Sequence, residues 1–156
     1  MKKIILSAVI VTSALASMAT YAAGSDSTEF QVKITVNESC QFTSAQHVEF
    51  NDVDRSTKAG STAKGQLNVT CTKNTPYQIA LVGNGEMSNT DPNSTSKVPY
   101  KLYQNAARTA VWNDVNLLPG TGNGKDQAIA VYAKLAGDTN VEAGNYVDRV
   151  TATVTY

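Results

Sequence analysis

Few residues in this chain are of a type and spacing that could do chemistry. His47 is the only histidine among 156 residues, so a serine nucleophile would depend on this single imidazole as its base. It stands beside Val48 in a strand-like run, which is typical of an ordinary surface or edge-strand histidine. The two cysteines, Cys40 and Cys71, cannot complete a four-ligand zinc site with one histidine unless carboxylates contribute.

Two further patterns resemble functional sites only superficially. Carboxylates cluster at Glu49, Asp52 and Asp54, and paired acids cleave glycosidic bonds in some enzymes. The same spacing is found on a solvated strand and loop. The stretch 120–125 resembles a phosphate-binding loop but lacks the Gly-Lys-Ser/Thr ending and the helix that would follow. We therefore expect a protein that is not an enzyme, with no catalytic residue, no cofactor and no metal.

Charge and composition narrow the class of protein further. Thirteen Lys and Arg balance 13 Asp and Glu, and no basic run is present. This balance argues against electrostatic binding of nucleic acid. The length predicts one domain, and seven Tyr, ten Gly and many Thr and Val favour β-structure.

The N-terminus predicts export. A positive start at Lys2 and Lys3 is followed by an apolar stretch over residues 4–16 and then by small residues. This pattern is that of a secretory signal peptide, with cleavage after Ala22 or Ala23. We take residues 1–22 as the signal. Its removal takes away two lysines and leaves a slightly acidic chain.

Export also bears on the cysteines. In an oxidising compartment a disulfide between Cys40 and Cys71 is the expected state. The chain-entropy relation gives such a bond about 3.5–4 kcal/mol for a loop of this length. The chain has no Cys-x-x-Cys motif, so a redox-active pair is not indicated.

The rest of the chain is a series of strand-like segments separated by polar turns, and this pattern predicts an antiparallel β-sandwich. Polar loops are expected at residues 55–65 and 86–97. The strand-like segments are residues 30–36, 40–43, 66–71, 77–83, 100–103, 127–135 and 146–156, with residues 47–53 and 109–112 as further candidates. Six or seven strands are expected in all, depending on how these two candidates are treated.

The first of these segments alternates strictly. Phe30, Val32, Ile34 and Val36 share one face, and polar side chains occupy the other. Alternation alone favours an ordinary first strand that pairs within its own domain. It does not show whether residues 30–36 pair in their own chain or with a neighbouring one.

Three features together resemble a known family. The first is the stretch 100–112, which matches a Tyr-x-Leu-Tyr, Ala-Ala-Arg-Thr and Trp pattern. The second is the ending 143–156, with Gly-x-Tyr-x-Asp before an alternating last strand. The third is one cysteine after an N-terminal alternating strand and another in an Asn-Val-Thr-Cys strand. The chain is similar to the archaic chaperone–usher pilins, whose domain is also called spore coat protein U.

The resemblance implies an incomplete immunoglobulin-like β-sandwich that lacks its last strand and is completed by donor-strand complementation. Residues 23–37 would be the donor segment and residues 38–156 the pilin domain. The donor side chains would be Phe30, Val32, Ile34 and Val36. The acceptor groove would be lined by Val150, Ala152, Val154 and Tyr156.

The implied function is that of a structural subunit of a surface fimbria for adhesion and biofilm formation. The implied partners are a periplasmic pilus chaperone, an outer-membrane usher, and identical or related pilin subunits joined head to tail. Nucleic acid is not among them. The chain would pass through the periplasm to the cell surface.

One alternative is a complete secreted β-sandwich that binds a carbohydrate or a surface, and another is a spore or extracellular coat protein. The binding module would use an aromatic platform drawn from Trp112, Tyr100, Tyr103 and Tyr132.

Overall fold

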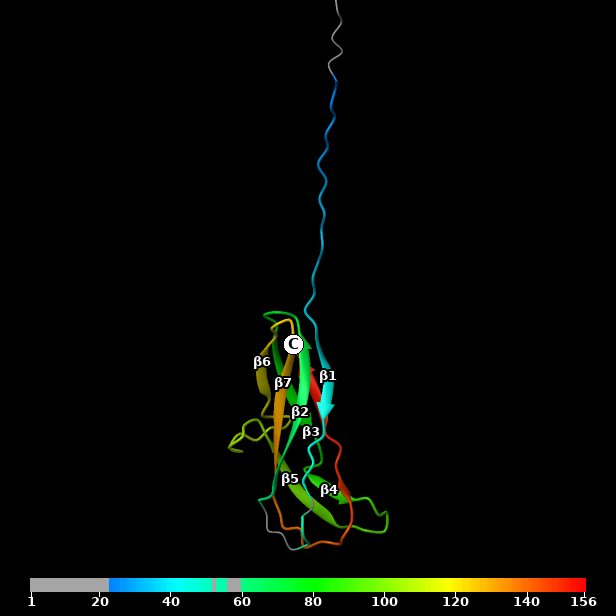
Figure 1. Ribbon diagram of the computed structural model, residues 1–156, viewed down its shortest axis with the longest axis vertical. Coiled ribbons are helices and arrows are strands. Elements are labelled where there is room, and N and C mark those ends of the chain that lie inside the picture. Colours follow the sequence, from blue (N-terminus) through cyan, green and yellow to red (C-terminus); the bar gives the residue numbers. More distant parts are fainter. Residues whose placement is uncertain (1–22, 52, 56–59) are drawn as a thin grey trace, which may run out of the picture. The chain divides into compact units, whose positions relative to one another are not determined.

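The computed structural model describes residues 23–51, 53–55 and 60–156 of the chain (Figure 1). It divides into two units, Met1–Thr35 and Val36–Tyr156, which we describe separately. The predicted signal peptide, residues 1–22, and the carboxylate of Asp52 lie outside the described residues.

In the first unit, residues 23–35 belong to no strand or helix. The apolar side chains of Phe30, Val32 and Ile34 are 84%, 89% and 88% exposed, and Val36 at the start of the second unit is 74% exposed. The pairing within the chain that alternation alone favours is therefore absent among the described residues.

The second unit is built of strands, and none of its described residues lies in a helix. The strands are β1 (Cys40–Gln46), β2 (Thr62–Cys71), β3 (Pro76–Val82), β4 (Glu86–Asn89), β5 (Lys97–Tyr103), β6 (Leu118–Thr121), β7 (Asp126–Leu135), β8 (Tyr146–Val147) and β9 (Thr151–Thr155).

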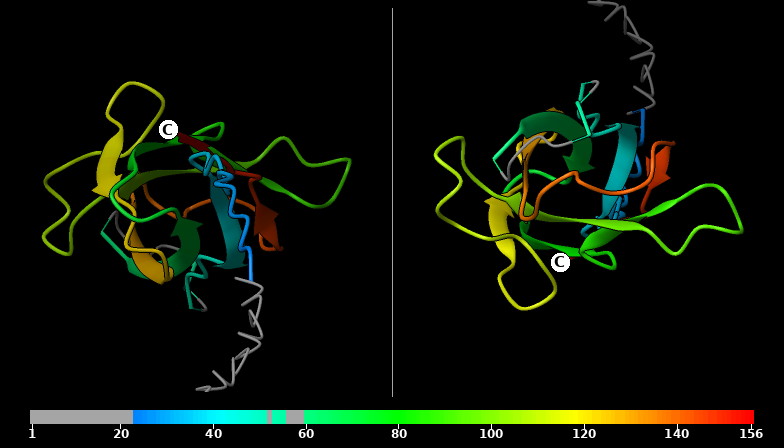
Figure 2. Two further views of the ribbon diagram at one scale, coloured as in Figure 1. Left: turned by 90° about the horizontal axis from the view of Figure 1, so that it is seen from above. Right: turned by 90° about the horizontal axis from the view of Figure 1, so that it is seen from below.

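These strands form two antiparallel sheets, seen end-on in Figure 2. One has the order β1-β2-β7-β5-β4-β8 and the other the order β6-β3-β9. An immunoglobulin sandwich places its strands A, B, E and D in one sheet and C, F and G in the other. Here β1-β2-β7-β5 takes the place of the first sheet and β3-β9 that of C and F. The predicted all-β, immunoglobulin-like sandwich is confirmed, and its G position holds no described strand.

Alternating side chains build the core between the sheets. In β7 the inward residues Val131, Ala133 and Leu135 are buried, whereas Tyr132 and Lys134 point outward. The main buried cluster joins both sheets, and a smaller cluster lies under β5. The main cluster consists of Cys40, Val69, Cys71, Tyr77, Ile79, Leu81, Trp112 and Val131.

The prediction of a strand at residues 47–53 is wrong, because the described residues of that segment form no strand. The segment instead crosses β2 at Gly65, where a Cβ atom would lie 2.7 Å from Val48 Cγ2 and 2.8 Å from the Gln46 carbonyl. Val48 packs against the main cluster and Phe50 against the smaller one. Their alternation therefore comes from side chains that fill the interior and not from pairing in a sheet.

Other boundaries also differ from those predicted. β2 begins inside the expected polar loop 55–65, and β4 lies inside the expected loop 86–97. Both segments are polar, and backbone pairing with β7 and β5 places them in the sheets. Residues 109–112 contribute only an isolated bridge from Val111 to Tyr103. The expected last strand is split into β8 and β9.

The disulfide is formed as expected. Cys40 and Cys71 are bonded and lie directly opposite one another in the β1–β2 register. Below them the register shifts between Phe42 and Ser44, which leaves Thr43 as the extra residue of a β-bulge.

Candidate functional site

The candidate site is the edge of β9. On one side β9 pairs with β3, so that Val154 lies opposite Ile79 and Ala152 opposite Leu81. Its other edge pairs with no strand among the described residues. Such an edge presents a row of unpaired N–H and C=O groups, which is a template for another strand.

The side chains of β9 make this edge apolar on its inner face. Ala152 and Val154 are partly buried against the main cluster. Val150 and Tyr156, just beyond the two ends of the strand, are 40% and 56% exposed. The four residues predicted to line the groove therefore occupy alternate positions on one face, along β9 and just beyond its ends. This edge has no described neighbour. We call the unpaired side of β9, with these four residues, the acceptor edge.

The strand β1 lies beside the acceptor edge without pairing to it. β1 forms a ladder with β2 alone, and it contacts β9 of the opposite sheet (Figure 1). Phe42 of β1 packs against the same cluster as Ala152 and Val154. Two strand edges, one from each sheet, therefore face the same opening of the sandwich.

The remaining sheet edges are poor templates. β6 is four residues long and contains Pro119, which has no N–H to donate. β8 at the far edge of the larger sheet is only two residues long. Short strands and proline are the means by which proteins block edge pairing. Among the described strands, the long edges left unblocked are those of β1 and β9.

Trp112 holds the two sheets together behind this edge. Its side chain is 2% exposed. The indole Nε1 donates to the Ile79 carbonyl of β3 at 2.8 Å, and the backbone N–H donates to the Leu102 carbonyl of β5 at 2.9 Å. The preceding loop is fixed by Asn105, whose Oδ1 accepts from the backbone N–H of Thr109 at 3.0 Å.

Asp148 fixes the link that leads into β9. Its carboxylate accepts from the Tyr100 hydroxyl at 2.7 Å and from the backbone N–H and the side-chain amide of Asn84 at 2.9 and 2.7 Å. Partial burial raises the pKa of Asp148, but these bonds, with one from the Arg149 N–H, outweigh it and hold the pKa below its usual value. Burial, reinforced by Asp148, raises the pKa of Tyr100. The sequence indicates no separate role for this aspartate, although the Gly-x-Tyr-x-Asp pattern marks its position.

A second carboxylate ties β1 to the sheet. Asp126, at the start of β7, accepts from the Thr43 hydroxyl at 2.5 Å, from the Asn68 amide, and from the Thr70 hydroxyl at 3.3 Å. Hydrogen bonds from Thr43 and Asn68 lower the pKa of Asp126. The bulged residue of β1 is thereby held across β2.

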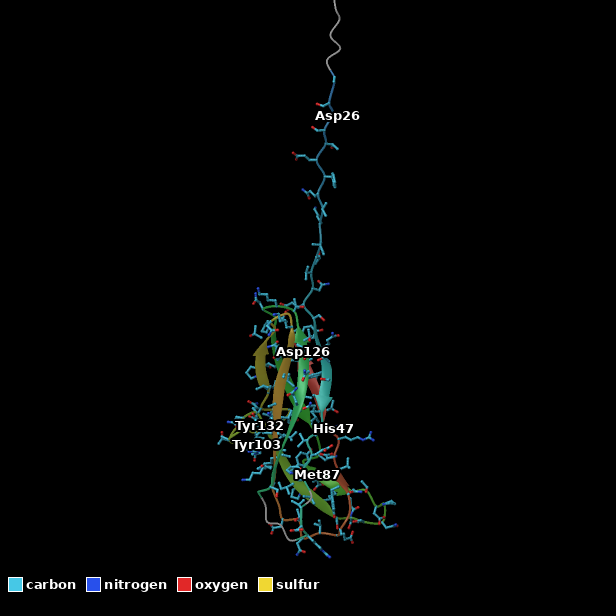
Figure 3. The ribbon with its side chains drawn as sticks, viewed as in Figure 1. Asp26, His47, Met87, Tyr103, Asp126 and Tyr132 are labelled. Atoms are coloured by element: carbon cyan, nitrogen blue, oxygen red, sulfur yellow. A yellow bond between two sulfur atoms is a disulfide. The ribbon has the colours of Figure 1, made fainter. Side chains whose placement is uncertain are left out.

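The aromatic platform of the alternative binding module does not form as a set. Trp112 and Tyr100 are 2% and 8% exposed and belong to the core. Tyr103 and Tyr132 are half-buried and lie opposite one another in the β5–β7 register, on the outer face (Figure 3).

The residues considered for chemistry do not converge. His47, Glu49 and Asp54 are exposed in the segment after β1. Within the described residues no group of three or more His, Cys, Asp or Glu is placed to hold a metal ion. That part of the chain also has no apolar helix of membrane-spanning length.

Comparison with known proteins identifies the family. Residues 26–153 match the Spore Coat Protein U domain. The chain belongs to the spore coat protein U domain family. No curated protein matches it significantly.

A solved structure that resembles this spore coat protein U domain chain is the CsuC–CsuE chaperone–tip adhesion subunit pre-assembly complex from archaic chaperone–usher Csu pili of Acinetobacter baumannii. The identity is 21% and the TM-score is 0.49. The match covers 78% of this chain and 40% of that one, so this chain spans less than half the length of that protein.

Proposed function

We propose that this chain is a structural subunit of a chaperone–usher fimbria that polymerises by donor-strand exchange. The observation that carries the proposal is the acceptor edge: one side of β9 pairs with no described strand and its inner face is apolar, in a chain that also has an exposed segment of matching alternation. Membership of the spore coat protein U domain family supports the same function.

The donor is the segment 23–37, and its side chains Phe30, Val32, Ile34 and Val36 recur every second residue. The acceptor-edge side chains recur with the same period, so a strand added to β9 satisfies its backbone groups and places alternate side chains against the core. At about 1.5–3 kcal/mol for each buried side chain, four of them contribute about 6–12 kcal/mol before ordering costs are subtracted.

Assembly follows from this geometry. Because the donor segment precedes the sandwich of residues 38–156 that accepts it, each contact is head to tail and does not close on itself, so an open filament results. Before assembly the exposed edge requires a cover, which a periplasmic pilus chaperone supplies by lending a strand. At the outer-membrane usher, the donor segment of an identical or related subunit replaces the chaperone's strand. The resulting fibre serves adhesion and biofilm formation at the cell surface.

The test is a deletion of residues 23–36 from the mature chain, expressed with and without a cognate periplasmic chaperone. We expect a soluble subunit only with the chaperone, and no polymer under any condition, because the acceptor edge stays but the donor is gone. Size-exclusion chromatography and electron microscopy measure the two outcomes. The full mature chain is the control and should polymerise. A stable monomer without chaperone would contradict the proposal and favour the complete secreted binding module.

A further inference from the structure

The outer face of the six-stranded sheet carries basic and aromatic side chains over β2, β7 and β5. The register places Lys64 opposite Tyr132 and Tyr132 opposite Tyr103, so these three form a row across the strands. In the next row Lys134 lies opposite Lys101. Both tyrosines are labelled in Figure 3, close together where β7 and β5 meet. With Arg108 from the following loop we call this set the basic patch; its members are Lys64, Lys101, Tyr103, Arg108, Tyr132 and Lys134.

Tyr132 is the centre of the basic patch. The Lys64 Nζ and the Arg108 Cζ each lie 5.8 Å from the centroid of its ring, within the range of a cation–π contact. Arg108 is also fixed from behind, since its Nε donates to the Ala133 carbonyl and its Nη1 to the Ala106 carbonyl, both at 3.0 Å. The guanidinium is thus ordered before any ligand binds, which lowers the entropy cost of binding.

The charges of the basic patch are not neutralised by carboxylates of the described residues. The salt bridge among the described residues joins Lys97 to Glu86, and neither of these belongs to the basic patch. The hydroxyls of Tyr103 and Tyr132 likewise have no hydrogen-bond partner in the described part of the chain. Four cations therefore gather on one sheet face of a chain that is slightly acidic once Lys2 and Lys3 are removed. Such a concentration of one sign favours an anionic partner.

We propose that the basic patch binds a carboxylated polysaccharide. Neighbouring strands lie about 4.8 Å apart, so the two rows offer cations and hydroxyl groups at short, regular intervals to an extended polymer. A sugar chain with one carboxylate per residue matches this arrangement: the ammonium and guanidinium groups bind the carboxylates, and the tyrosine hydroxyls bind sugar hydroxyls.

The geometry fits nucleic acid less well. Single strands bind by stacking bases on open aromatic faces, and the ring of Tyr132 already has Lys64 and Arg108 over it. Duplex DNA carries one charge per about 1.7 Å, a closer spacing than that of cations on neighbouring strands, which lie about 4.8 Å apart. The inference goes beyond the proposed function and does not depend on it, because the basic patch lies on the outer sheet face and involves neither the donor segment nor β9.

The experiment uses the exported full chain, purified from the periplasm with whatever partner accompanies it. Binding to sodium polygalacturonate is measured by biolayer interferometry, with neutral dextran and duplex DNA as comparison ligands. The test variant is Lys101→Gln/Lys134→Gln. The matched control, Lys73→Gln/Lys125→Gln, removes the same charge from exposed loop residues.

We expect binding to polygalacturonate that weakens with salt, and a Kd raised about fivefold in the test variant but less than twofold in the control. Thermal unfolding should be unchanged, since Lys101 and Lys134 are exposed. No binding to polygalacturonate, equal binding to dextran, tighter binding to DNA, or equal losses in both variants would each overturn the proposal. None of these results affects polymerisation, which the deletion of residues 23–36 tests separately.

Discussion

At the scale of single residues, the contacts of Asp148 decide how the chain enters β9. This carboxylate connects the turn after β3, through Asn84, with β5, through Tyr100, at the point where β8 ends. A lost hydrogen bond to a charged group costs about 1.5–3 kcal/mol. The Gly-x-Tyr-x-Asp pattern therefore marks a fixed corner as well as the start of a strand.

The pH dependence of stability follows from this site. The folded-state pKa of Asp148 is lowered, so its contribution to stability is present above the ordinary carboxyl pKa and is lost as pH falls through the lower folded value. We expect Asp148→Asn to be less stable than the wild-type chain at pH 7 and the difference to shrink at pH 3. Urea unfolding of both proteins at the two pH values measures this.

Some acid sensitivity should remain in Asp148→Asn, because the pKa of Asp126 is also lowered. A difference between the two proteins that is equal at pH 3 and pH 7 would show that the charge of Asp148 does not contribute. Tyr100→Phe, which removes one donor to this carboxylate, should reduce the pH-dependent part without abolishing it.

At the scale of elements, the proposed assembly depends on one face of the segment 23–37, and the neighbouring position on the other face provides a matched comparison. Ile34→Asp places a charge among the four apolar donor side chains, whereas Lys33→Asp changes the opposite face. We expect Ile34→Asp to slow or stop assembly and to leave chaperone capture intact, because the acceptor edge is unchanged. Lys33→Asp should assemble at close to the normal rate.

Light scattering during assembly and co-purification with the chaperone measure the two effects. If Ile34→Asp assembles as fast as the wild-type chain, the proposed donor face is wrong. If both variants fail equally, charge on the segment matters and its register does not.

The elements predicted correctly from sequence are those in which alternation and burial coincide. β3 and β7 carry apolar residues at every second position that face one core. The segment 47–53 has the same alternation, but Val48 and Phe50 fill the interior over Gly65 without strand pairing. Period-2 patterns report which side chains face inward and not whether the backbone is paired.

The opposite error occurs at β4. Residues 86–89 are mostly polar, so no hydrophobic pattern marks them, and they form a strand through pairing with β5 and β8. The acceptor edge was inferred from family resemblance, since a strand with an unpaired edge has the same sequence pattern as one in a complete sheet. The basic patch could not be found either, because Lys64, Lys101 and Lys134 come from three strands that only the register aligns.

At the scale of the whole molecule, the disulfide lies where a filament of the proposed kind would load the subunit. A subunit held in a filament by its donor segment is pulled at the root of that segment, next to Cys40. The bond to Cys71 transfers this load from the edge strand β1 to the end of β2, which pairs with β7 along its length. Without this bond, β1 is held by its ladder with β2, by the packing of Phe42 against the main cluster and by the hydrogen bond from Thr43 to Asp126.

This load path through the disulfide predicts how much the unfolding step lengthens when the bond is reduced. With the disulfide intact, the segment between Cys40 and Cys71, a separation of 31 residues, stays closed when a subunit unfolds. At about 3.4 Å per extended residue, reduction should lengthen the unfolding step by on the order of 100 Å. Single-molecule stretching of the full chain with and without reductant measures the step, and Cys40→Ser/Cys71→Ser should give the longer value in both conditions. Steps of equal length in oxidised and reduced protein would show that the load does not pass through this bond, because only a closed loop withholds those residues from extension.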